Sequence, residues 1–554
     1  MNQILKIGVI SDSTIKPISD ALARSLDRLG LDSEIRESPN EVVEQTILDS
    51  RSLLRQWQPD LYILYLTTPR IDLDNLTGAT EHQIQNDIDE VSNQLIDYWK
   101  ILHQDSSCKI IQTLYQDLSF SIGGLAESTL PWSQQNVIQR INQRLIEIRP
   151  DWVSLIDINK AIRRVGTENW IDRRLQYQFQ FPFSPLVSND VSKLFESGLR
   201  RSLNLNIKAL VVDLDNTLWG GIVGDDGITG IELGPGSARG EAFLDFCKYI
   251  KNIARQGIVL SICSKNDIDV VAEVFTKHPH MPLKLDDFAE VVCNWKNKSL
   301  NIRRIAENLN LSLDSIAFID DNPAECAEVH ANIPEIRTVL MDMDPTSFID
   351  VLDSELLFER NDLSDTDMMR TAYYSGRRKA LQTASSTEKY TDFLEGLEMT
   401  CITTPLTQSN ISRVAELESR TNQFNSMTRR RDLYSLTSLP PSTKTLTFQL
   451  KDRFLDHGIV GALSYEVSGD QLIITDWMMS CRVFARTLEQ FCLQDVLEKN
   501  YSAIKYLKVE FLHTPKNNMM MEILKTLGFE DDALGYLVIQ SSDVRALKTY
   551  IRTI

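Results

Sequence analysis

The chain has 554 residues, which is long enough for three or four domains. Hydrophobic residues make up 42% and charged residues 24%, a composition that is typical of a folded protein and excludes a disordered one. Lys and Arg number 58 against 77 Asp and Glu, and the resulting net charge of −19 argues against general binding to nucleic acids or anionic membranes.

The eight cysteines are dispersed and none forms a CxxC pair, so the sequence predicts neither a zinc ribbon nor a disulfide framework. The opening segment MNQILKIGVISDST lacks the pattern of a signal peptide. No window approaches about 20 uninterrupted apolar residues, the length needed to span a bilayer. We therefore expect a cytoplasmic protein with reduced thiols and no membrane span.

The first unit, predicted over residues 1–200, alternates strands and helices. The apolar runs ILKIGVI, LYILYL and KIIQTL are separated by helical stretches such as ISDALARSLDRLG, which favours a parallel sheet with helices on both faces. The turn SDST resembles the start of SGNH hydrolases, in which Ser11 or Ser13 would be the nucleophile. The matching stretch for the base, WIDRRLQYQF, contains Asp172 but no histidine. We therefore predict an inactive SGNH-like domain that serves docking or stability.

The middle unit, predicted over residues 201–360, carries the strongest group of candidate catalytic residues. ALVVDLDNTLW places Asp213 and Asp215 directly after a buried strand, and SIAFIDDN places Asp320 and Asp321 after another. Ligands of open α/β sheets bind at the carboxyl ends of the strands. Neighbouring carboxylates repel one another unless a cation offsets them, so this acidic group predicts a hard metal such as Mg²⁺.

Other polar residues follow strands of the same unit. Thr217 lies two residues after Asp215, SICSKND supplies Ser264, and NWKNKSLNI supplies Lys296 and Lys298. A single aspartate after a strand is often only a helix cap, but the ordered set is much harder to explain by structure alone. This set resembles the haloacid dehalogenase (HAD) superfamily of phosphohydrolases, whose core is a Rossmann-like α/β sheet.

The HAD resemblance implies specific roles. Asp213 would be the nucleophile that accepts a phosphoryl group, and Asp215 the acid/base that protonates the leaving oxygen and later activates water. Asp213, Asp320 and the backbone carbonyl of Asp215 would hold Mg²⁺. The implied contacts to phosphate and substrate are Thr217, Ser264, Lys265 and Lys298, the last preferred over Lys296 from its spacing to SLNI. Only about 47 residues separate Asp215 from Cys263, so we expect no large cap over this site.

A narrower resemblance spans nearly the whole chain. DLDNTLWGGIVGDDG, SKND, FIDDNPAE, TNQFN and DHGIVG with SCR together resemble the FkbH-like family. The resemblance implies transfer of a glyceryl unit from 1,3-bisphosphoglycerate to the phosphopantetheine thiol of an acyl carrier protein, with removal of phosphate, for polyketide biosynthesis. A stand-alone phosphatase, a GNAT-type N-acyltransferase with a vestigial HAD unit and a non-catalytic scaffold are alternatives. The complete HAD set disfavours the last two.

A helical connector is predicted over 361–397 and a GNAT-like α+β unit over 398–554. The latter has closely spaced strands, TLTFQLKD, GIVGALSYEV and QLIITDWMM, followed by a helix. In GNAT enzymes an RxxGxG-type turn binds the pyrophosphate of coenzyme A, but Ala485 and Thr487 replace the two glycines here. A carrier-bound phosphopantetheine lacks the second phosphate and needs less of that turn.

The last unit also holds the candidates for acyl transfer. Cys481 precedes that turn, where Arg482 and a helix N-terminus favour a lowered thiol pKa. We interpret Cys481 as the carrier of a glyceryl thioester and His457 as its base; a small buried cysteine and a structural histidine are the alternative. Asn422 and Asn425 in TNQFN either line the groove for the carrier arm or form a capped turn.

The sequence also predicts where an acyl carrier protein would dock. Acyl carrier proteins are usually acidic, so a broadly acidic surface would repel one, and docking should depend on a local basic patch. The run of three arginines at 429–431, together with Arg420, is the predicted patch in the last unit.

Overall fold

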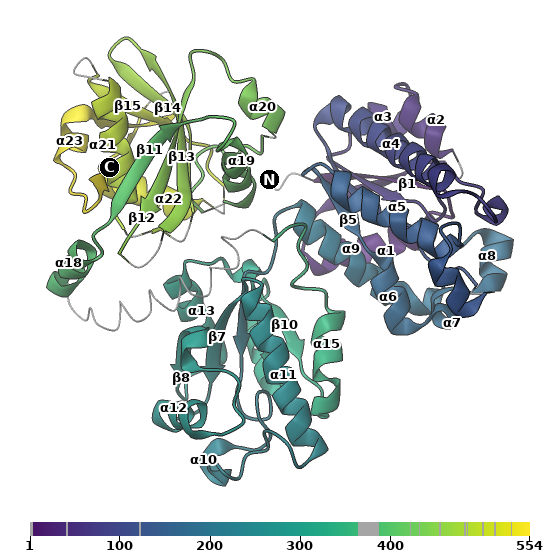
Figure 1. Cartoon of the computed structure of the whole chain (residues 1–554). Coiled ribbons are helices and arrows are strands. Elements are labelled where there is room, and N and C mark those ends of the chain that lie inside the picture. Colours follow the sequence, from purple (N-terminus) through teal and green to yellow (C-terminus); the bar gives the residue numbers. More distant parts are fainter. Residues whose placement is uncertain are drawn as a thin grey trace. The chain divides into compact units, whose positions relative to one another are not determined.

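The computed structural model describes residues 4–39, 42–120, 123–363, 387–421, 423–431, 433–453, 456–480, 483–484, 486–500, 504–514, 517–532 and 535–554. The chain divides into two compact units, Met1–Asn206 with Asp350–Asp362, and Ile207–Ile349 with Leu363–Ile554. The second unit contains two separate sheets (Figure 1). Most of the predicted connector, 361–397, lies outside the described residues.

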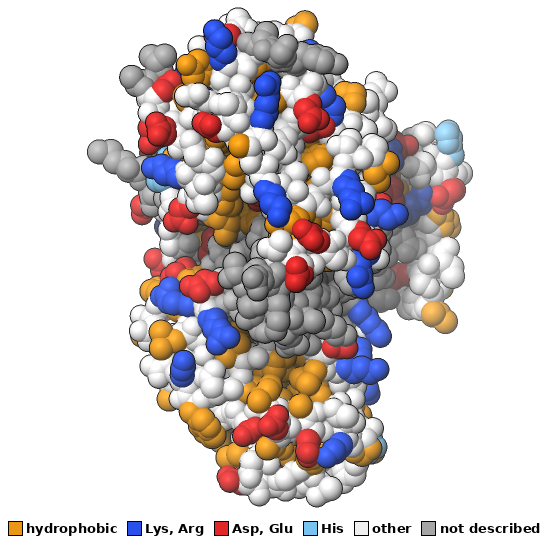
Figure 2. Space-filling view, turned by 90° about the vertical axis from the view of Figure 1, so that its left-hand side faces the viewer, with side chains coloured by type: hydrophobic (Ala, Val, Ile, Leu, Met, Phe, Trp, Pro, Cys, Tyr) orange, Lys and Arg blue, Asp and Glu red, His pale blue; other side chains and the backbone are white. Residues whose placement is uncertain are grey.

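The surface carries charges of both signs. Figure 2 shows acidic and basic side chains interspersed over the face in view, so the net charge of −19 is not concentrated there in one acidic field. No helix among the described residues is long and apolar enough to cross a membrane.

The N-terminal unit is built on a five-stranded parallel sheet with the order β2-β1-β3-β4-β5. Its strands are β1 (Leu5–Ser11), β2 (Ser33–Glu37), β3 (Leu61–Tyr65), β4 (Lys109–Thr113) and β5 (Val153–Ile156). Its helices are α1 (Lys16–Arg28), α2 (Val43–Leu48), α3 (Leu53–Gln56), α4 (Glu81–Ser106), α5 (Gln134–Ile148), α6 (Ile158–Val165), α7 (Thr167–Trp170), α8 (Arg173–Phe179) and α9 (Ser188–Ser202).

Helices cover both faces of this sheet, which explains why the central strand β3 is apolar and buried at every position. Tyr62 and Leu64 of β3 pack in a cluster with residues of α2 to α5, whereas Leu61, Ile63 and Tyr65 pack in another with α1, α6, α7 and α9. Successive side chains of a strand point to opposite faces, so a strand buried on both faces reads as a continuous apolar run.

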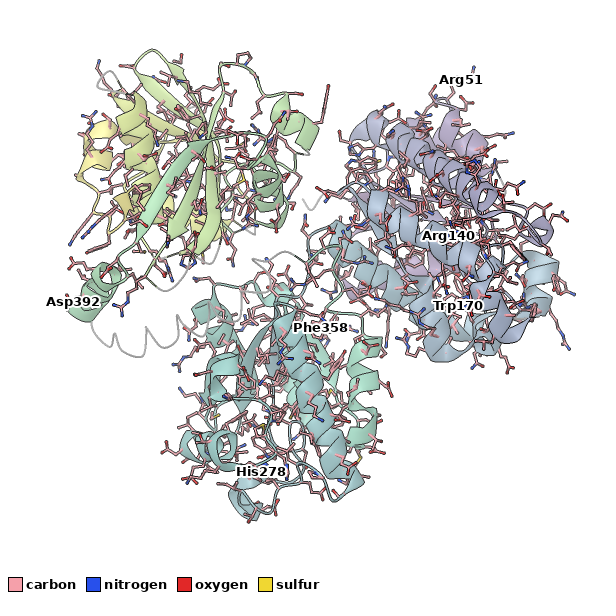
Figure 3. The ribbon with its side chains drawn as sticks, in the orientation of Figure 1. Arg51, Arg140, Trp170, His278, Phe358 and Asp392 are labelled. Atoms are coloured by element: carbon pink, nitrogen blue, oxygen red, sulfur yellow. The ribbon has the colours of Figure 1, made fainter. Side chains whose placement is uncertain are left out.

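The segment 179–188, where Pro and Ser interrupt the pattern, is a packed connection. Phe183 is buried against Trp170, and the indole of Trp170 (labelled in Figure 3) donates to Gln116 Oε1 at 3.2 Å. Asp172, at the position where an SGNH base would be sought, caps α8 by accepting from the backbone N–H groups of Arg174 and Leu175. The N-terminal unit therefore uses this region for packing.

Residues 350–362 return to the N-terminal unit after the second sheet, whereas the sequence predicted that the middle unit extends to residue 360. Three ion pairs hold this segment: Lys193 with Glu355 at 2.7 Å, Lys160 with Glu359 at 2.8 Å, and Arg149 with Asp362 at 2.7 Å. The acidic residues of this segment are spread along the sequence, and only the fold brings them to their cationic partners.

The middle sheet is also five-stranded and parallel, with the order β10-β9-β6-β7-β8. Its strands are β6 (Ala209–Val212), β7 (Val259–Ser264), β8 (Phe288–Cys293), β9 (Ile316–Asp320) and β10 (Arg337–Leu340). Its helices are α10 (Val223–Asp226), α11 (Ala238–Arg255), α12 (Ile268–Lys277), α13 (Lys298–Leu309), α14 (Pro323–Asn332) and α15 (Phe348–Ser354). The structure describes every residue between Asp215 and β7, and the only helices there are α10 and α11. This short segment agrees with the prediction that no large cap covers the site.

The C-terminal sheet has eight strands in the order β16-β17-β15-β14-β13-β12-β11-β18. The strands are β11 (Thr400–Pro405), β12 (Lys444–Lys451), β13 (Asp456–Ser468), β14 (Gln471–Met479), β15 (Tyr506–Glu510), β16 (Glu530–Asp531), β17 (Tyr536–Gln540) and β18 (Arg552–Thr553). The helices are α18 (Thr387–Gly396), α19 (Ile411–Arg420), α20 (Leu433–Thr437), α21 (Leu488–Asn500), α22 (Asn518–Thr526) and α23 (Ser541–Ala546). The sheet is largely antiparallel, but β14 and β15 pair in parallel.

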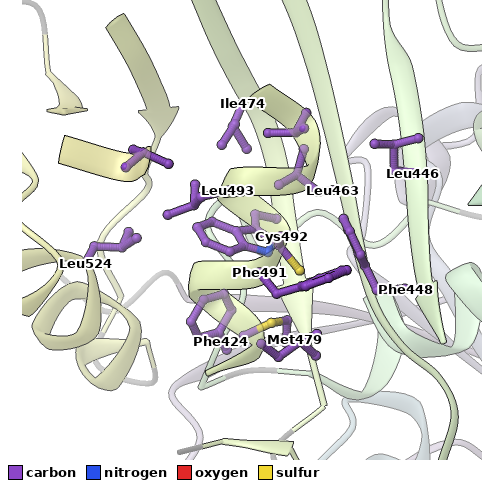
Figure 4. Packing of buried hydrophobic residues seen from close by; sticks show 14 of the residues in the cluster. Phe424, Leu446, Phe448, Leu463, Ile474, Met479, Phe491, Cys492, Leu493 and Leu524 are labelled. Carbon is purple, nitrogen blue, oxygen red and sulfur yellow. The ribbon is translucent and has the colours of Figure 1, made fainter. Parts of the chain in front are cut away.

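The core of this last sheet is apolar and well filled. Figure 4 shows Cys492 of α21 among Phe424, Phe448 and Phe491, and this cysteine is fully buried. A second cluster, from α19 and α20, packs on the other face of the sheet. The predicted fold class, a multi-domain α/β chain with two parallel sheets and a final α+β unit, is confirmed.

Candidate active site

The carboxyl ends of three adjacent strands bring the HAD candidates together. β6 lies between β7 and β9, and the backbone N–H of Asp213 still donates to Ile319 O at 3.1 Å. Ser264 ends β7 and Asp320 ends β9. Because parallel strands end at the same edge, residues more than 100 positions apart in the sequence meet there.

Lys298 lies between the two principal carboxylates. Its Nζ is 2.8 Å from Asp213 Oδ1 and 2.5 Å from Asp320 Oδ2, and the side chain is only 4% exposed. Burial lowers the pKa of Lys298, but the charges of Asp213 and Asp320 outweigh this effect and raise the pKa above its usual value. The lysine is therefore a fixed positive charge, and the preference for Lys298 over Lys296 agrees with its position.

Three carboxylates face one another around this lysine. Oxygens of Asp213, Asp320 and Asp321 lie within 4.8 Å of one another. When ionised they carry a charge of −3, and Lys298 supplies +1, which leaves −2 in a largely buried site. Burial and the charge of Asp213 raise the pKa of Asp320, and burial raises the pKa of Asp321. This oxygen-rich set with two uncompensated charges fits a hard divalent cation.

The carboxylate set contains both implied carboxylate ligands of Mg²⁺ and adds a third carboxylate, while the role of the Asp215 carbonyl stays a prediction. The implied ligands were Asp213, Asp320 and the main-chain carbonyl of Asp215, whereas the third carboxylate in the cluster is that of Asp321. Thr217, implied as a phosphate contact, is fully buried and donates through Oγ1 to Asp321 Oδ1 at 3.2 Å. In this geometry Thr217 orients Asp321.

The carboxylate of Asp215 is held apart from this cluster by three donors. Oδ1 accepts from Trp219 Nε1 at 2.9 Å and from the backbone N–H of Val223 at 3.1 Å, and Oδ2 accepts from Asn266 Nδ2 at 2.9 Å. Sequence reasoning did not identify Trp219 or Asn266 as site residues. Asn266 could have been identified from the sequence, because it lies two residues after Ser264 in the SKND motif.

The other implied phosphate and substrate contacts lie at the same edge. Ser264 is buried and its Oγ accepts from Asn266 Nδ2 at 3.1 Å. Lys265 is partly exposed and pairs with Glu325 of α14 at 2.5 Å. Both residues therefore lie around the carboxylate cluster, as the sequence predicted, and their contacts with a substrate stay a prediction.

The C-terminal candidates divide into described and undescribed residues. Cys481, Arg482 and Asn422 lie outside the described residues. His457 is buried, and its Nε2 is 2.8 Å from Asp452 Oδ2; Arg486 Nη1 is 2.6 Å from the same oxygen. Sequence reasoning missed Asp452 and Arg486, since they are five and 29 residues from the histidine.

Side chains of the TNQFN turn and of the arginine run make hydrogen bonds and ion pairs within the C-terminal unit. Asn425 is buried; its Nδ2 donates to Thr421 O and its Oδ1 accepts from Thr428 N, which supports the capped-turn alternative. Arg429 pairs with Asp476 and Glu510, and Arg431 pairs with Glu418 and Asp476. Two of the three arginine charges are thus offset by carboxylates, and the role of this run, together with Arg420, as a docking patch stays a prediction.

Among the described residues, the edge of the N-terminal sheet has no comparable cluster of carboxylates. Asp12, after β1, accepts from the backbone N–H of Thr67 at 2.9 Å, from Thr67 Oγ1 at 3.0 Å and from the backbone N–H of Thr68 at 3.2 Å. Ser11 and Ser13 are buried and their hydroxyls lie 2.9 Å apart. The inactivity of this SGNH-like unit stays a prediction.

Comparison with known proteins supports the family and the fold. Residues 6–193 match the model of the FkbH N-terminal domain. A crystal structure of the N-terminal part of a Bacteroides fragilis protein, containing a phosphatase domain complexed with Mg, matches with a TM-score of 0.58 and 27% identity over 65% of this chain and 94% of that one. No curated protein matches.

Two further solved structures match shorter parts of the chain. A lipase/acylhydrolase from Enterococcus faecalis has a TM-score of 0.25 and 14% identity over 36% of this chain and 96% of that one. A ribosomal-protein-S18-alanine N-acetyltransferase from Escherichia coli has a TM-score of 0.19 and 13% identity over 26% and 94%. The match to the FkbH N-terminal domain covers residues 6–193, and the FkbH-like resemblance is confirmed for that part of the chain.

Proposed function

We propose that this chain is a Mg²⁺-dependent phosphatase and glyceryl transferase that loads glyceryl from 1,3-bisphosphoglycerate onto an acyl carrier protein. The observation that carries the proposal is the buried cluster of Asp213, Asp320 and Lys298 at the edge of the middle sheet. The Mg-bound phosphatase domain of the Bacteroides fragilis protein supports it, as does the match to the FkbH N-terminal domain.

The phosphatase half uses the two carboxylates of DLD in different settings. Asp213 attacks phosphorus and forms an acyl phosphate, while the ester oxygen of the substrate leaves with a proton from Asp215; water then cleaves the acyl phosphate and releases phosphate. Lys298 reduces the repulsion between the attacking carboxylate and the phosphate dianion. Asp213, Asp320 and Asp321 would hold Mg²⁺, which supplies further neutralisation of charge.

The acyl-transfer half is assigned to the C-terminal unit. A cysteine thiolate, proposed as Cys481, attacks the carbonyl of the mixed anhydride; the C–O bond to phosphate breaks and phosphate leaves. The carrier thiol then displaces Cys481, which regenerates the thiolate. His457 would accept and return the proton, and its contact with Asp452 supports this role because a carboxylate fixes the tautomer of the imidazole.

Mass spectrometry of a pantetheinylated carrier protein tests the whole proposal. With 1,3-bisphosphoglycerate and Mg²⁺, the expected result is a glyceryl adduct on the carrier without phosphate. Release of phosphate with no adduct would favour a stand-alone phosphatase. Acylation of an amine from an acyl-coenzyme A, with no release of phosphate, would favour a GNAT-type N-acyltransferase with a vestigial HAD unit.

A matched pair of variants tests the assignment of the acyl-transfer half. Asp452→Asn should slow carrier loading by at least about tenfold, because the imidazole loses its orienting carboxylate, and should leave release of phosphate from a simple ester unchanged. Asp456→Asn is the control, since Asp456 is exposed and contacts Gln449 instead of His457. Equal loading rates for the two variants would remove His457 and Asp452 from the mechanism.

A further inference from the structure

A buried amide bridges two parts of the phosphatase site. Asn266 follows β7 by two residues, is 6% exposed, and contacts two side chains through one atom: Nδ2 lies 2.9 Å from Asp215 Oδ2 and 3.1 Å from Ser264 Oγ. No role in the proposed reaction has so far been given to this residue.

The chemistry of its partners fixes the orientation of the amide. Asp215 is ionised once it has protonated the leaving group, and an ionised carboxylate only accepts hydrogen bonds, so the NH₂ group of Asn266 and not its carbonyl must then face Asp215. The two hydrogens of that group then serve Asp215 and Ser264. The serine hydroxyl is thus an acceptor from Asn266 and keeps its own proton available for another acceptor.

The other contacts of Asp215 reach only its second oxygen. Oδ1 accepts from Trp219 Nε1 and from the backbone N–H of Val223, and the Trp219 ring packs edge-on against Phe275, with centroids 6.0 Å apart and an interplanar angle of 71°. In the described part of the chain, Asn266 makes the only hydrogen bond to Oδ2. Removing the Asn266 amide would take this hydrogen bond from Oδ2 of Asp215, while Oδ1 would keep its two donors.

We propose that Asn266 is a positioning residue that holds Asp215 in the orientation needed to protonate the leaving group. The inference rests on the proposed acid/base role of Asp215. It assigns to the SKND motif a second function beyond that of Ser264, namely to connect the strand that ends at the serine with the loop that carries the acid.

The dependence of the reaction on its leaving group separates this role from a structural one. A nitrophenolate departs without protonation, whereas an alkoxide must be protonated as it leaves. Asn266→Ala should therefore lower kcat/KM for glycerol phosphate by at least about tenfold, and for p-nitrophenyl phosphate by less than about threefold. A loss of phosphate binding through Ser264 would lower both values equally and would overturn the inference.

A double-mutant cycle gives an independent measurement. If Asn266 acts through Asp215, then adding Asn266→Ala to Asp215→Asn should change kcat/KM for glycerol phosphate by less than about twofold, although Asn266→Ala alone lowers it by at least about tenfold, because the group that it positions is already absent. Full additivity of the two losses would overturn the inference. Asn266→Asp keeps the volume of the side chain and replaces the donor by an acceptor. This variant takes the place of Asn266→Ala in both measurements if the alanine variant does not fold.

Asn308→Ala is the matched control. Asn308 Nδ2 also donates to a carboxylate of the same sheet, Glu290 Oε2 at 3.1 Å, but it lies near the end of α13 remote from Lys298. This variant should show no dependence on the leaving group. If the wild-type chain releases no phosphate from either ester, the proposed phosphatase function fails; if it does so and Asn266→Ala slows both esters equally, only the role of Asn266 fails.

Discussion

The N-terminal and middle sheets have the same architecture, but the aspartates that follow their strands have different surroundings. Both are five-stranded and parallel, and in both an aspartate follows a buried strand: Asp12 after β1 and Asp213 after β6. Asp12 is surrounded by donors of the next strand's loop, so its charge is satisfied locally. Asp213 instead faces two further carboxylates and one lysine.

The difference shows that a strand-end aspartate becomes a functional site through its neighbours. Two backbone N–H groups and the Thr67 hydroxyl donate to Asp12, although burial still raises the pKa of this carboxyl. Around Asp213 two further carboxylates repel it, and Lys298 offsets only one of the three charges. Uncompensated buried charge costs stability, and a bound cation relieves it.

The largest expected effect distinguishes the two aspartates directly. Asp213→Asn should reduce phosphate release by at least about 1,000-fold, because an amide does not replace the carboxylate as nucleophile. Asp12→Asn, which is nearly isosteric and lies in the other sheet, should change the rate by less than about twofold. Steady-state phosphate release checks both, and equal losses would contradict the contrast between the sheets.

Metal binding should depend on the second aspartate of the middle sheet. Mg²⁺ should raise the melting temperature of the wild-type chain, since a ligand that binds only the folded state stabilises it. Asp320→Asn should raise the Mg²⁺ midpoint of this shift by at least about tenfold and should not lower the melting temperature without metal, because it removes a repelling charge. An unchanged midpoint would exclude Asp320 as a ligand; Asp12→Asn is the control.

A smaller effect is expected for the structural aspartate. Asp12→Ala should destabilise the N-terminal sheet by about 1–3 kcal/mol, because the backbone N–H groups of Thr67 and Thr68 and the Thr67 hydroxyl lose a charged acceptor. Hydrogen exchange of amides in β1 and β3 measures this for the N-terminal unit alone. Unchanged protection of these amides would show that Asp12 is not needed to hold the two strands' loops together.

The smallest effect is expected for the serine that resembles an SGNH nucleophile. Ser13→Ala removes one hydrogen bond, to Ser11, and should cost less than about 1.5 kcal/mol. Any hydrolysis of a short-chain nitrophenyl ester by the chain should be unaffected. Loss of such hydrolysis in Ser13→Ala, but not in Ser128→Ala on the same unit, would show that the N-terminal sheet is catalytic after all.

The sequence identified most of the phosphatase site because its residues lie in short motifs tied to strand ends. Asp213, Ser264 and Asp320 each follow a recognisable apolar run, and Lys298 follows from its order in the set. Contacts made inside the site were much harder to predict. Nothing local to Asn266 indicates that its amide meets Asp215, because that meeting depends on β6 and β7 being neighbours.

The C-terminal unit also contains ion pairs that could not be predicted from the sequence. Arg429 and Arg431 are adjacent cations in the sequence and indicated a docking patch, but Asp476 and Glu418 reach them from β14 and α19. His457 gained a partner in Asp452 across the turn between β12 and β13. Charge read along the chain does not account for the pairing that folding produces.

By itself, the sequence determined the architecture and the predicted site residues, because apolar periodicity and strand-end motifs are local properties of the chain. The tertiary structure decided which charged residues remain uncompensated. Asp12, Arg431 and Glu359 contact groups from other elements, whereas Asp213, Asp320 and Asp321 are brought to one another. Pairing between distant residues depends on which strands are neighbours in a sheet, and that order leaves one strand-end aspartate among hydrogen-bond donors and the other among carboxylates.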